Sequence, residues 1–229
     1  MKLPSFFDKK VTKAEVNKDR NRIRVKEHVH GNWPTIIYIP INIKKDEEAE
    51  EEELLKRIRS EFKDFELVQV DPLSPETSTF PFHLSLSRTL YVKDHQKELF
   101  KEKIREALKF KEFPDKLKLE KVEIYLNDEM TRTFIAIDLE NDERIIKLIE
   151  SIDKILKDFG LPIYYKAPKL HFSLFWCKGN QMEKLRKFKI EEVNLKGFEV
   201  EVDEIFIKCG NKTHEITRTK SHEITSRKI

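Results

Sequence analysis

The sequence predicts an α+β fold, with two pseudo-symmetric lobes of antiparallel sheet and flanking helices around a central cleft. Strand-like and helix-like segments follow one another without the strict alternation that a parallel sheet requires. The pattern His-x-Ser-Leu occurs on two predicted strands, at His83 and at His171, which suggests one copy in each of two similar lobes. Apolar residues make up 38% of the chain and include 16 Phe, enough to fill a core.

In the first half of the chain, apolar periodicity predicts three strands and two helices. One predicted helix begins with a run of acidic residues, which suits the helix dipole, and continues with apolar residues at helical spacing. Another segment alternates with period two, which places His83, Ser85 and Ser87 on one face of a strand. The predicted strands are 33–40, 65–70 and 82–87, and the predicted helices are 46–64 and 94–110.

The second half is predicted to contain four strands and two helices. Two alternating runs meet at residues 127–129, which predicts a hairpin. A helix with a clear apolar face ends at Gly160 and Pro162. The last strand leads into a turn at Gly210–Lys212. The predicted strands are 117–126, 132–139, 170–176 and 200–208, and the predicted helices are 141–158 and, approximately, 180–188.

The composition excludes several classes of protein. No apolar run reaches the roughly 18 residues of a membrane span, and residues 1–20 lack the apolar stretch of a secretory signal. Cys177 and Cys209 are too few for a disulfide scaffold and fit a reducing compartment, where we expect both to be buried thiols. We therefore expect a soluble intracellular monomer that does not contact a membrane.

The net charge of +3 averages two basic ends and an acidic body. Residues 1–30 carry a net charge of +5 and residues 208–229 one of +4, which leaves −6 for the residues between them. Basic arms suit an anionic partner such as nucleic acid, although solvated lysine-rich tails would have the same composition. We predict a flexible basic arm at 1–30, one bilobal domain at 31–216 and a tail at 217–229.

The repeated motif contains the residue types that RNA cleavage without a metal needs. Such cleavage requires a base for a ribose hydroxyl and an acid for the leaving oxygen, and histidine, with an ordinary pKa of ~6.5, can do either. A serine two residues along a strand points the same way as the histidine and can donate to a phosphate oxygen. Two unrelated strand histidines, bonded within the sheet, would give the same pattern and remain an alternative.

Other chemistries fit the sequence less well. It contains no P-loop, no Gly-x-Gly-x-x-Gly and no nucleophile elbow. His28 and His30 are the only pair with metal-like spacing, and neither cysteine forms a Cys-x-x-Cys with them. We predict that the protein uses no metal and no other cofactor.

Several segments together resemble the 2H phosphoesterase superfamily and, within it, the U6 small nuclear RNA phosphodiesterase family. The resemblance spans roughly residues 31–216. Family members usually carry a small residue after the second motif, where this chain has Phe175, a departure that leaves both histidines and both serines in place. The matching segments are Gly31–Trp33, Phe82–Ser87, Thr131–Phe134, Tyr165–Pro168, His171–Leu174, Trp176–Cys177 and Gly210–Lys212.

This resemblance implies a bilobal 2H phosphoesterase fold and a 3′-to-5′ exoribonuclease that trims the oligouridine tail of U6 RNA, in the nucleus and without a metal. It implies that His83 and His171 are the catalytic pair and that Ser85 and Ser173 bind the scissile phosphate. Tyr165 matches the aromatic residue that stacks on the terminal base, and a packed aromatic at the entry to a strand is the alternative.

The mechanism that we expect is transesterification. We assign His171 as the base that takes a proton from the penultimate ribose 2′-OH, which then attacks its own 3′-phosphate, and His83 as the acid that protonates the departing 5′-oxygen. The RNA then ends in a 2′,3′-cyclic phosphate, which some relatives open to a 3′-phosphate. Two alternatives are a cyclic phosphodiesterase acting on other RNA ends and a non-catalytic RNA-binding module that uses the same cleft.

Overall fold

The computed structural model describes residues 29–41, 48–70, 82–187, 195 and 198–216. The chain divides into two units, residues 1–30 and 31–229, and the description below concerns the second. The predicted arm, apart from Val29 and His30, and the predicted tail lie outside the described residues, so the domain boundaries stay predictions. Within the described ranges, no helix is both long and apolar enough to cross a membrane.

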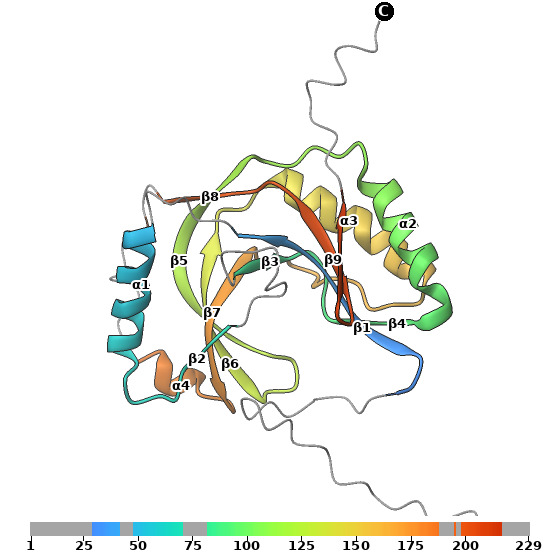
Figure 1. Ribbon diagram of the computed structural model, residues 1–229. Helices are drawn as coiled ribbons and strands as arrows, with labels where there is room; N and C mark the ends of the chain where they lie inside the picture. Colours follow the sequence, from blue (N-terminus) through green and yellow to red (C-terminus); the bar gives the residue numbers. More distant parts are fainter. Residues whose placement is uncertain (1–28, 42–47, 71–81, 188–194, 196–197, 217–229) are drawn as a thin grey trace, which may run out of the picture. The chain divides into compact units, whose positions relative to one another are not determined.

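Ten strands in the described ranges form one sheet, in which each neighbouring pair runs antiparallel (Figure 1). Their order across the sheet is β10-β9-β1-β3-β7-β6-β5-β8, while β2 lies beside β7 and β4 beside β1. The strands are β1 Asn32–Pro40, β2 Val68–Gln69, β3 His83–Ser85, β4 Leu90–Lys93, β5 Lys116–Leu126, β6 Arg132–Leu139, β7 His171–Lys178, β8 Glu199–Glu201, β9 Ile205–Cys209 and β10 Lys212–Ile216.

The sheet consists of two similar halves that meet where β3 pairs with β7. One half runs outward from the first motif strand as β3-β1-β9-β10, and the other runs outward from the second motif strand as β7-β6-β5-β8. Each half therefore begins with its own copy of the motif. The predicted α+β class with two lobes of antiparallel sheet is confirmed.

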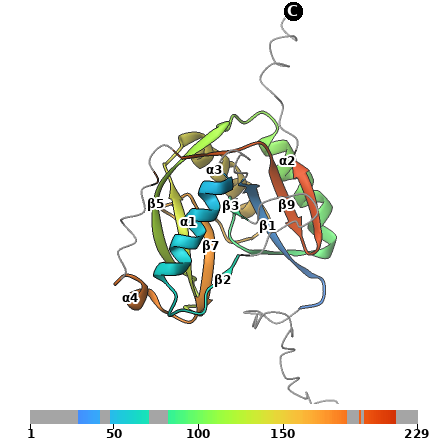
Figure 2. The ribbon, with the colours of Figure 1, turned by 60° about the vertical axis from the view of Figure 1, so that its left-hand side comes forward.

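The helices flank the two halves of this sheet, α2 and α3 beside the first half and α1 beside the second (Figures 1 and 2). α2 and α3 pack against each other, and the rings of Phe100 and Phe159 meet edge to face with centroids 5.2 Å apart. α1 lies beside the second half, where the guanidinium of Arg59 sits 5.2 Å from the ring centroid of Phe175. The helices are α1 Glu48–Glu61, the 3-10 helix η2 Asp94–Gln96, α2 Lys97–Leu108, α3 Glu143–Asp158 and α4 Met182–Leu185.

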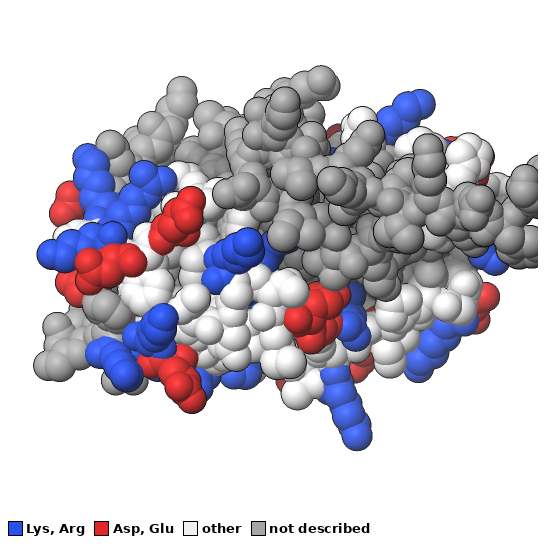
Figure 3. Space-filling view, turned by 90° about the horizontal axis from the view of Figure 1, so that it is seen from below, with Lys and Arg blue, Asp and Glu red and all other residues white. Residues whose placement is uncertain are grey.

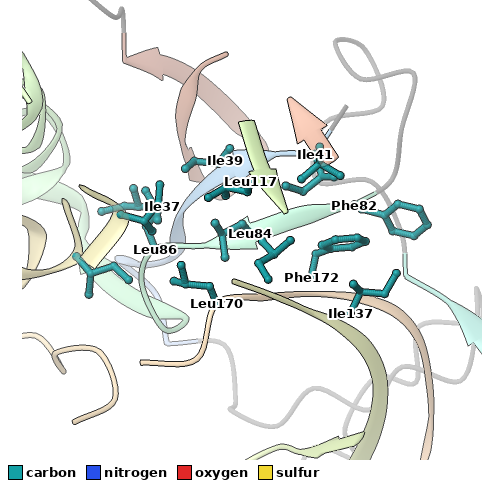
Figure 4. Close-up of a cluster of buried hydrophobic side chains, with 14 of the residues drawn as sticks. Ile37, Ile39, Ile41, Phe82, Leu84, Leu86, Leu117, Ile137, Leu170 and Phe172 are labelled. Atoms are coloured by element: carbon teal, nitrogen blue, oxygen red, sulfur yellow. The ribbon is translucent and has the colours of Figure 1, made fainter. Parts of the chain in front are cut away.

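The hydrophobic core lies on one face of the two motif strands. Leu84 of β3 and Phe172 of β7 are paired in the sheet and are 0% and 1% exposed (Figure 4). Ile37 and Ile39 of β1 belong to the same cluster, as does Ile137 of β6. Because side chains alternate along a strand, burying these residues turns the residues between them toward the opposite face. The core thus fixes the direction in which the motif side chains point.

The first motif strand is shorter than its alternation predicts. β3 ends at Ser85, and Ser87 lies in a bend, 1% exposed. Its hydroxyl accepts a hydrogen bond from the backbone N–H of Ile37 at 3.0 Å, in place of a ladder carbonyl. The strand therefore ends two residues earlier than predicted, and Ser87, beyond its end, supplies the partner that a buried backbone donor needs.

The last predicted strand, 200–208, is two strands in the structure. β8 pairs with β5 in the second half, whereas β9 pairs with β1 in the first half. The strand must therefore be interrupted between them so that the chain can pass from one half to the other. At the break, the N–H of Val202 donates to the carbonyl of Asp115 at 2.8 Å. Further differences are that β2 covers only part of 65–70, that α4 is shorter than 180–188, and that neither β4 nor β10 was predicted.

The predicted turn at Gly210–Lys212 is confirmed and joins β9 to β10. Gly210 has a φ of +60°, and a Cβ atom at this position would stand 2.5 Å from a ring carbon of Trp33. A side chain would therefore be strained and would also collide with the ring. Two of the segments that carry the family resemblance, Gly31–Trp33 and Gly210–Lys212, are thus packed against each other and have a structural role.

Charged side chains on the described surface are mixed in sign. On the face seen from below, lysines and arginines lie beside aspartates and glutamates (Figure 3). Many are partners of one another, such as Lys121 with Glu123 at 2.9 Å and Lys116 with Glu199 at 3.0 Å. Exposed pairs of this kind contribute little to stability, typically about 0–1 kcal/mol each.

Candidate active site

The two motif strands are direct neighbours, and their register decides which motif residues meet. Leu84 pairs with Phe172 across β3 and β7. In an antiparallel ladder, this pairing sets each histidine opposite the serine of the other motif. All four motif side chains point away from the core, toward what we call the motif face, and all four are half-buried. The two opposed pairs are His83 with Ser173 and Ser85 with His171.

His83 lies in the less solvated environment. The ring of Tyr38, on the adjacent β1, meets it edge to face with centroids 5.7 Å apart. Its Nδ1 is buried and has no hydrogen-bond partner among the described residues. Burial lowers the pKa of His83 to about 4, and the positive charges of His171 and Lys208 act in the same direction. In the free protein, His83 is therefore neutral at physiological pH.

His171 has polar support that His83 lacks. Its Nδ1 lies 2.9 Å from the carbonyl oxygen of Lys169. Because a carbonyl can only accept, Nδ1 carries a proton in this contact, and Nε2 is left to take or give one. Burial lowers the pKa of His171, while the Lys169 carbonyl and the charge of Asp138 act against that shift.

An aromatic side chain also fixes the plane of the His171 ring. Tyr125, on β5, stacks on it with centroids 4.2 Å apart and an angle of 19° between the planes. The hydroxyl of Tyr125 donates to Asp138 Oδ1 at 2.5 Å. Asp138 is itself the residue of β6 that pairs with His171. These three side chains form a contiguous group on the motif face.

Tyr165 is on the surface, as a base-stacking residue would need to be. Its side chain is 47% exposed, and the guanidinium of Arg88 lies 4.8 Å from its ring centroid. Its hydroxyl lies 3.4 Å from a carboxylate oxygen of Asp128, which also forms an ion pair with Arg88. Tyr164, which is buried, meets the Tyr165 ring edge to face at 5.3 Å. The loop after α3 thus presents one aromatic ring and packs its neighbour inside.

The departure from the family pattern at Phe175 does not affect the motif face. Ser173 pairs with Ala136 but Phe175 pairs with Ile135, so β7 contains one extra residue between these two pairs. This β-bulge turns Phe175 to the side of Ile135. There it is 0% exposed and lies beneath Arg59 of α1. Phe175 therefore repacks the strand instead of narrowing the site.

Three residues beside the histidines were not identified from the sequence: Tyr38, Tyr125 and Asp138. Only Asp138 left a usable signal, since it is a lone acid inside the apolar run 134–139 and is 5% exposed. A buried carboxylate needs hydrogen-bond partners and often marks a site. The two tyrosines have ordinary strand positions, and only the strand order places them beside the motifs.

The motif face combines two titratable imidazoles with two hydroxyl donors in a sheet built from two similar halves. Such a set can hold a phosphate between the serines while one imidazole removes a proton and the other supplies one. No group of three or more His, Cys, Asp or Glu side chains in the described part of the chain is arranged to hold a metal ion. Fold and site together define a two-histidine phosphoesterase.

Comparisons with known proteins agree with this class. The protein-family model HVSL, described as an uncharacterised conserved protein, matches residues 1–217. U6 snRNA phosphodiesterase 1 of Drosophila melanogaster is 32% identical over 83% of this chain and 72% of its own length. The Xenopus laevis protein of the same name is 30% identical over 87% of this chain and 79% of its own length. The chain belongs to the HVSL family and, with these relatives, to the U6 snRNA phosphodiesterase family.

A solved structure supports the fold independently of sequence. Usb1 of Kluyveromyces marxianus superposes with a TM-score of 0.60, covering 80% of this chain and 97% of that one, at 14% identity. At this identity the likeness is one of fold alone. It agrees with the two-lobed architecture that the repeated motif predicted.

Proposed function

We propose that this protein is an RNA phosphodiesterase that trims the 3′ oligouridine end of U6 snRNA in the nucleus, one nucleotide at a time. The observation that carries the proposal is the β3–β7 register, which sets two His-x-Ser units on one face with each histidine opposite the other serine. The relatives named U6 snRNA phosphodiesterase 1 support the choice of RNA.

In the proposed reaction, His171 removes the proton from the 2′-OH of the penultimate ribose. The 2′-oxygen forms a bond to its own 3′-phosphorus, and the bond from phosphorus to the 5′-oxygen of the last nucleotide breaks. His83 gives its proton to that 5′-oxygen. Ser85 and Ser173 donate hydrogen bonds to the non-bridging phosphate oxygens, where negative charge increases. The products are a nucleoside with a free 5′-OH and an RNA that ends in a 2′,3′-cyclic phosphate.

The two histidines are suited to these roles in different ways. Asp138 and the Lys169 carbonyl favour the cation that forms when His171 accepts a proton. His83 is neutral in the free protein, and the negative phosphodiester brought beside it favours its protonated form. Substrate binding thus prepares the acid, and protein groups support the base. Neither step needs a metal.

Tyr165 is proposed to stack on the terminal base. Its exposed ring is held in place by Arg88 and Asp128, so little side-chain freedom is lost when a base packs against it. Base–aromatic stacking contributes about 1–3 kcal/mol per base and accepts any base. The uridine preference of the proposed substrate would then come from contacts other than this stack.

The test is a digestion of an oligouridine-ended RNA in EDTA, with the new 3′-terminus identified by mass. We expect shortened RNA with a cyclic phosphate, and no product when the penultimate ribose is 2′-deoxy, because the nucleophile is then missing. His83→Ala and His171→Ala should each abolish trimming. His95→Ala is the matched control, since His95 is exposed on η2, outside the motif face.

Other results would identify other functions. Cleavage by both histidine variants, or cleavage of the 2′-deoxy substrate, would contradict the proposal. If the protein opened a 2′,3′-cyclic phosphate but did not trim the oligouridine end, it would be a cyclic phosphodiesterase acting on other RNA ends. Binding without cleavage between about pH 5.5 and 8, a range around the ordinary histidine pKa, would indicate an RNA-binding module.

A further inference from the structure

The buried carboxylate beside His171 has a defined partner. Asp138 is 5% exposed and is one of few buried charged or polar side chains among the described residues. A carboxylate in such a position needs hydrogen-bond donors, because its desolvation is otherwise costly. The hydroxyl of Tyr125 supplies one at 2.5 Å. Burial and the bond to Asp138 raise the pKa of Tyr125, so the hydroxyl stays protonated and remains a donor.

The same tyrosine contacts the imidazole. Its ring stacks on His171 at 4.2 Å and 19°, which restricts rotation of the imidazole out of that plane. Tyr125 therefore touches His171 with its ring and Asp138 with its hydroxyl. Because Asp138 pairs with His171 across β6 and β7, the three side chains come from three adjacent strands.

The other half has no such arrangement, because β1 sets Pro40 opposite His83 where β6 sets Asp138 opposite His171. Tyr38 meets His83 edge to face at 76° and does not stack on the imidazole as Tyr125 does on His171. The charges that act on His83 come from His171 and Lys208, and both disfavour its protonated form. The group around His171 is thus a particular feature of one half and does not follow from the repeated motif.

We propose that Tyr125 and Asp138 are positioning residues for His171, the tyrosine fixing the ring plane and the carboxylate stabilising the imidazolium that forms when Nε2 takes a proton. The inference rests on the proposed function, in which His171 is the base. Neither residue touches the reacting atoms. The Lys169 carbonyl holds Nδ1–H, Asp138 supplies negative charge, and Tyr125 keeps both the ring and the carboxylate in place.

The titration of His171 depends on every charged group that faces it. His83 faces it from β3, Asp138 from β6 and Tyr125 from β5, and Lys169 stands two residues before it, ahead of β7. Of these, only Asp138 adds negative charge near neutral pH, because Tyr125 stays protonated. Replacing Asp138 by Asn should therefore lower the pKa of His171 further, while the side-chain volume is nearly unchanged.

The first measurement needs no substrate. The protein is labelled with ¹⁵N-histidine, the His171 signals are assigned by their loss in His171→Asn, and their midpoint is followed with pH by NMR. Asp138→Asn should shift the midpoint to lower pH. Glu199→Gln is the matched control: this carboxylate lies on β8 of the same half and bonds to Lys116, and its removal should leave the midpoint nearly unchanged.

The second measurement is kinetic. Tyr125→Phe keeps the stacked ring and loses the hydroxyl, and it should lower kcat about tenfold with KM unchanged. Tyr125→Leu loses both and should lower kcat about 100-fold, which is part of the ~10²–10⁴-fold that a placed base contributes. The graded loss separates a positioning role from a general loss of stability, which the NMR spectra of the variants also monitor.

An unchanged His171 midpoint in Asp138→Asn would overturn the inference, as would wild-type kcat in both Tyr125 variants. Failure of the proposed function looks different. In that case the wild-type protein would not cleave RNA, yet the midpoint of His171 would still move in Asp138→Asn.

Discussion

The two halves of the sheet carry the same His-x-Ser unit in unlike surroundings. His83 has a buried Nδ1 without a partner among the described residues, an edge-on tyrosine, and a pKa that burial, His171 and Lys208 all lower. His171 has a carbonyl on Nδ1, a carboxylate across the ladder and a tyrosine stacked on its ring. A repeated motif thus gives two similar positions, and the neighbouring strands make them chemically different. On this difference we base the proposal that His171 acts as base and His83 as acid.

The largest expected effect tests which histidine has which role. We predict that His83→Ala and His171→Ala each lower cleavage of ordinary RNA by about 10²–10⁴-fold. When sulfur replaces the bridging 5′-oxygen, the leaving group no longer needs a proton. His83→Ala should then regain most of its rate, whereas His171→Ala should remain slow on both substrates. Single-turnover rates on the two RNAs measure this.

The opposite pattern, with rescue of His171→Ala alone, would exchange the two roles and contradict our interpretation of Asp138. His95→Ala should behave as wild type on both RNAs, since that residue is exposed and lies on η2, outside both motif strands.

A second effect concerns the pH dependence of the free energy of unfolding, to which we expect His83 to contribute more than His171. The pKa of His83 is about 4 in the folded protein and ~6.5 when unfolded, so below pH 6.5 the unfolded chain takes up the proton first. Stability from this residue is therefore fully present above pH 6.5 and is lost as the pH falls toward 4. The loss amounts to up to about 3 kcal/mol, at 1.36 kcal/mol per unit.

Urea unfolding at pH 7 and at pH 4.5 measures this effect as a difference between variants. His83→Gln should unfold with a smaller pH dependence than wild type, because the titrating group is gone. His171→Gln should keep most of the wild-type dependence, since Asp138 and the Lys169 carbonyl oppose the lowering there. Equal pH dependence in wild type and His83→Gln would show that His83 is not the buried neutral group described above.

The sequence allowed the fold class and most elements to be predicted, for reasons visible in single segments. α3 has an apolar face, and its Asp142 cap accepts a hydrogen bond from the Arg144 N–H at 2.8 Å. Nearby residues alone are therefore enough to predict this helix and its start. β5 and β6 alternate and meet at a hairpin in which Asn127 accepts from two backbone N–H groups. Such signals are local, and they agree with the tertiary structure.

What escaped prediction depends on partners distant in the chain. β8 and β9 divide one predicted strand, 200–208, because they pair with strands in different halves. Phe175 changes face through a bulge that only the pairing with β6 reveals. In the site, the two motifs were visible in the sequence. Tyr125 was not, because it comes close to His171 only through the order of β5, β6 and β7 in the sheet. Periodicity carries no information about such neighbours.

The smallest expected effect concerns the surface aromatic of the His171 half. Tyr165 is exposed, whereas the aromatic pair in the other half, Tyr38 with Phe206, is stacked in the sheet at 5.8 Å with Tyr38 buried. If Tyr165 stacks on the terminal base, Tyr165→Ala loses about 1–3 kcal/mol of binding, a rise in KM of roughly 5- to 150-fold. Tyr165→Phe keeps the ring and should lose much less.

The control is another exposed aromatic under a cation. Phe110 is 74% exposed, and the Lys109 ammonium lies 5.3 Å from its ring centroid, after α2 and outside the motif face. Phe110→Ala should leave KM unchanged. Because stacking accepts any base, the penalty for Tyr165→Ala should be equal on uridine-ended and adenosine-ended RNA. A penalty confined to one base would mean that Tyr165 recognises the edge of that base. An unchanged KM in Tyr165→Ala would contradict the proposal that Tyr165 stacks on the terminal base.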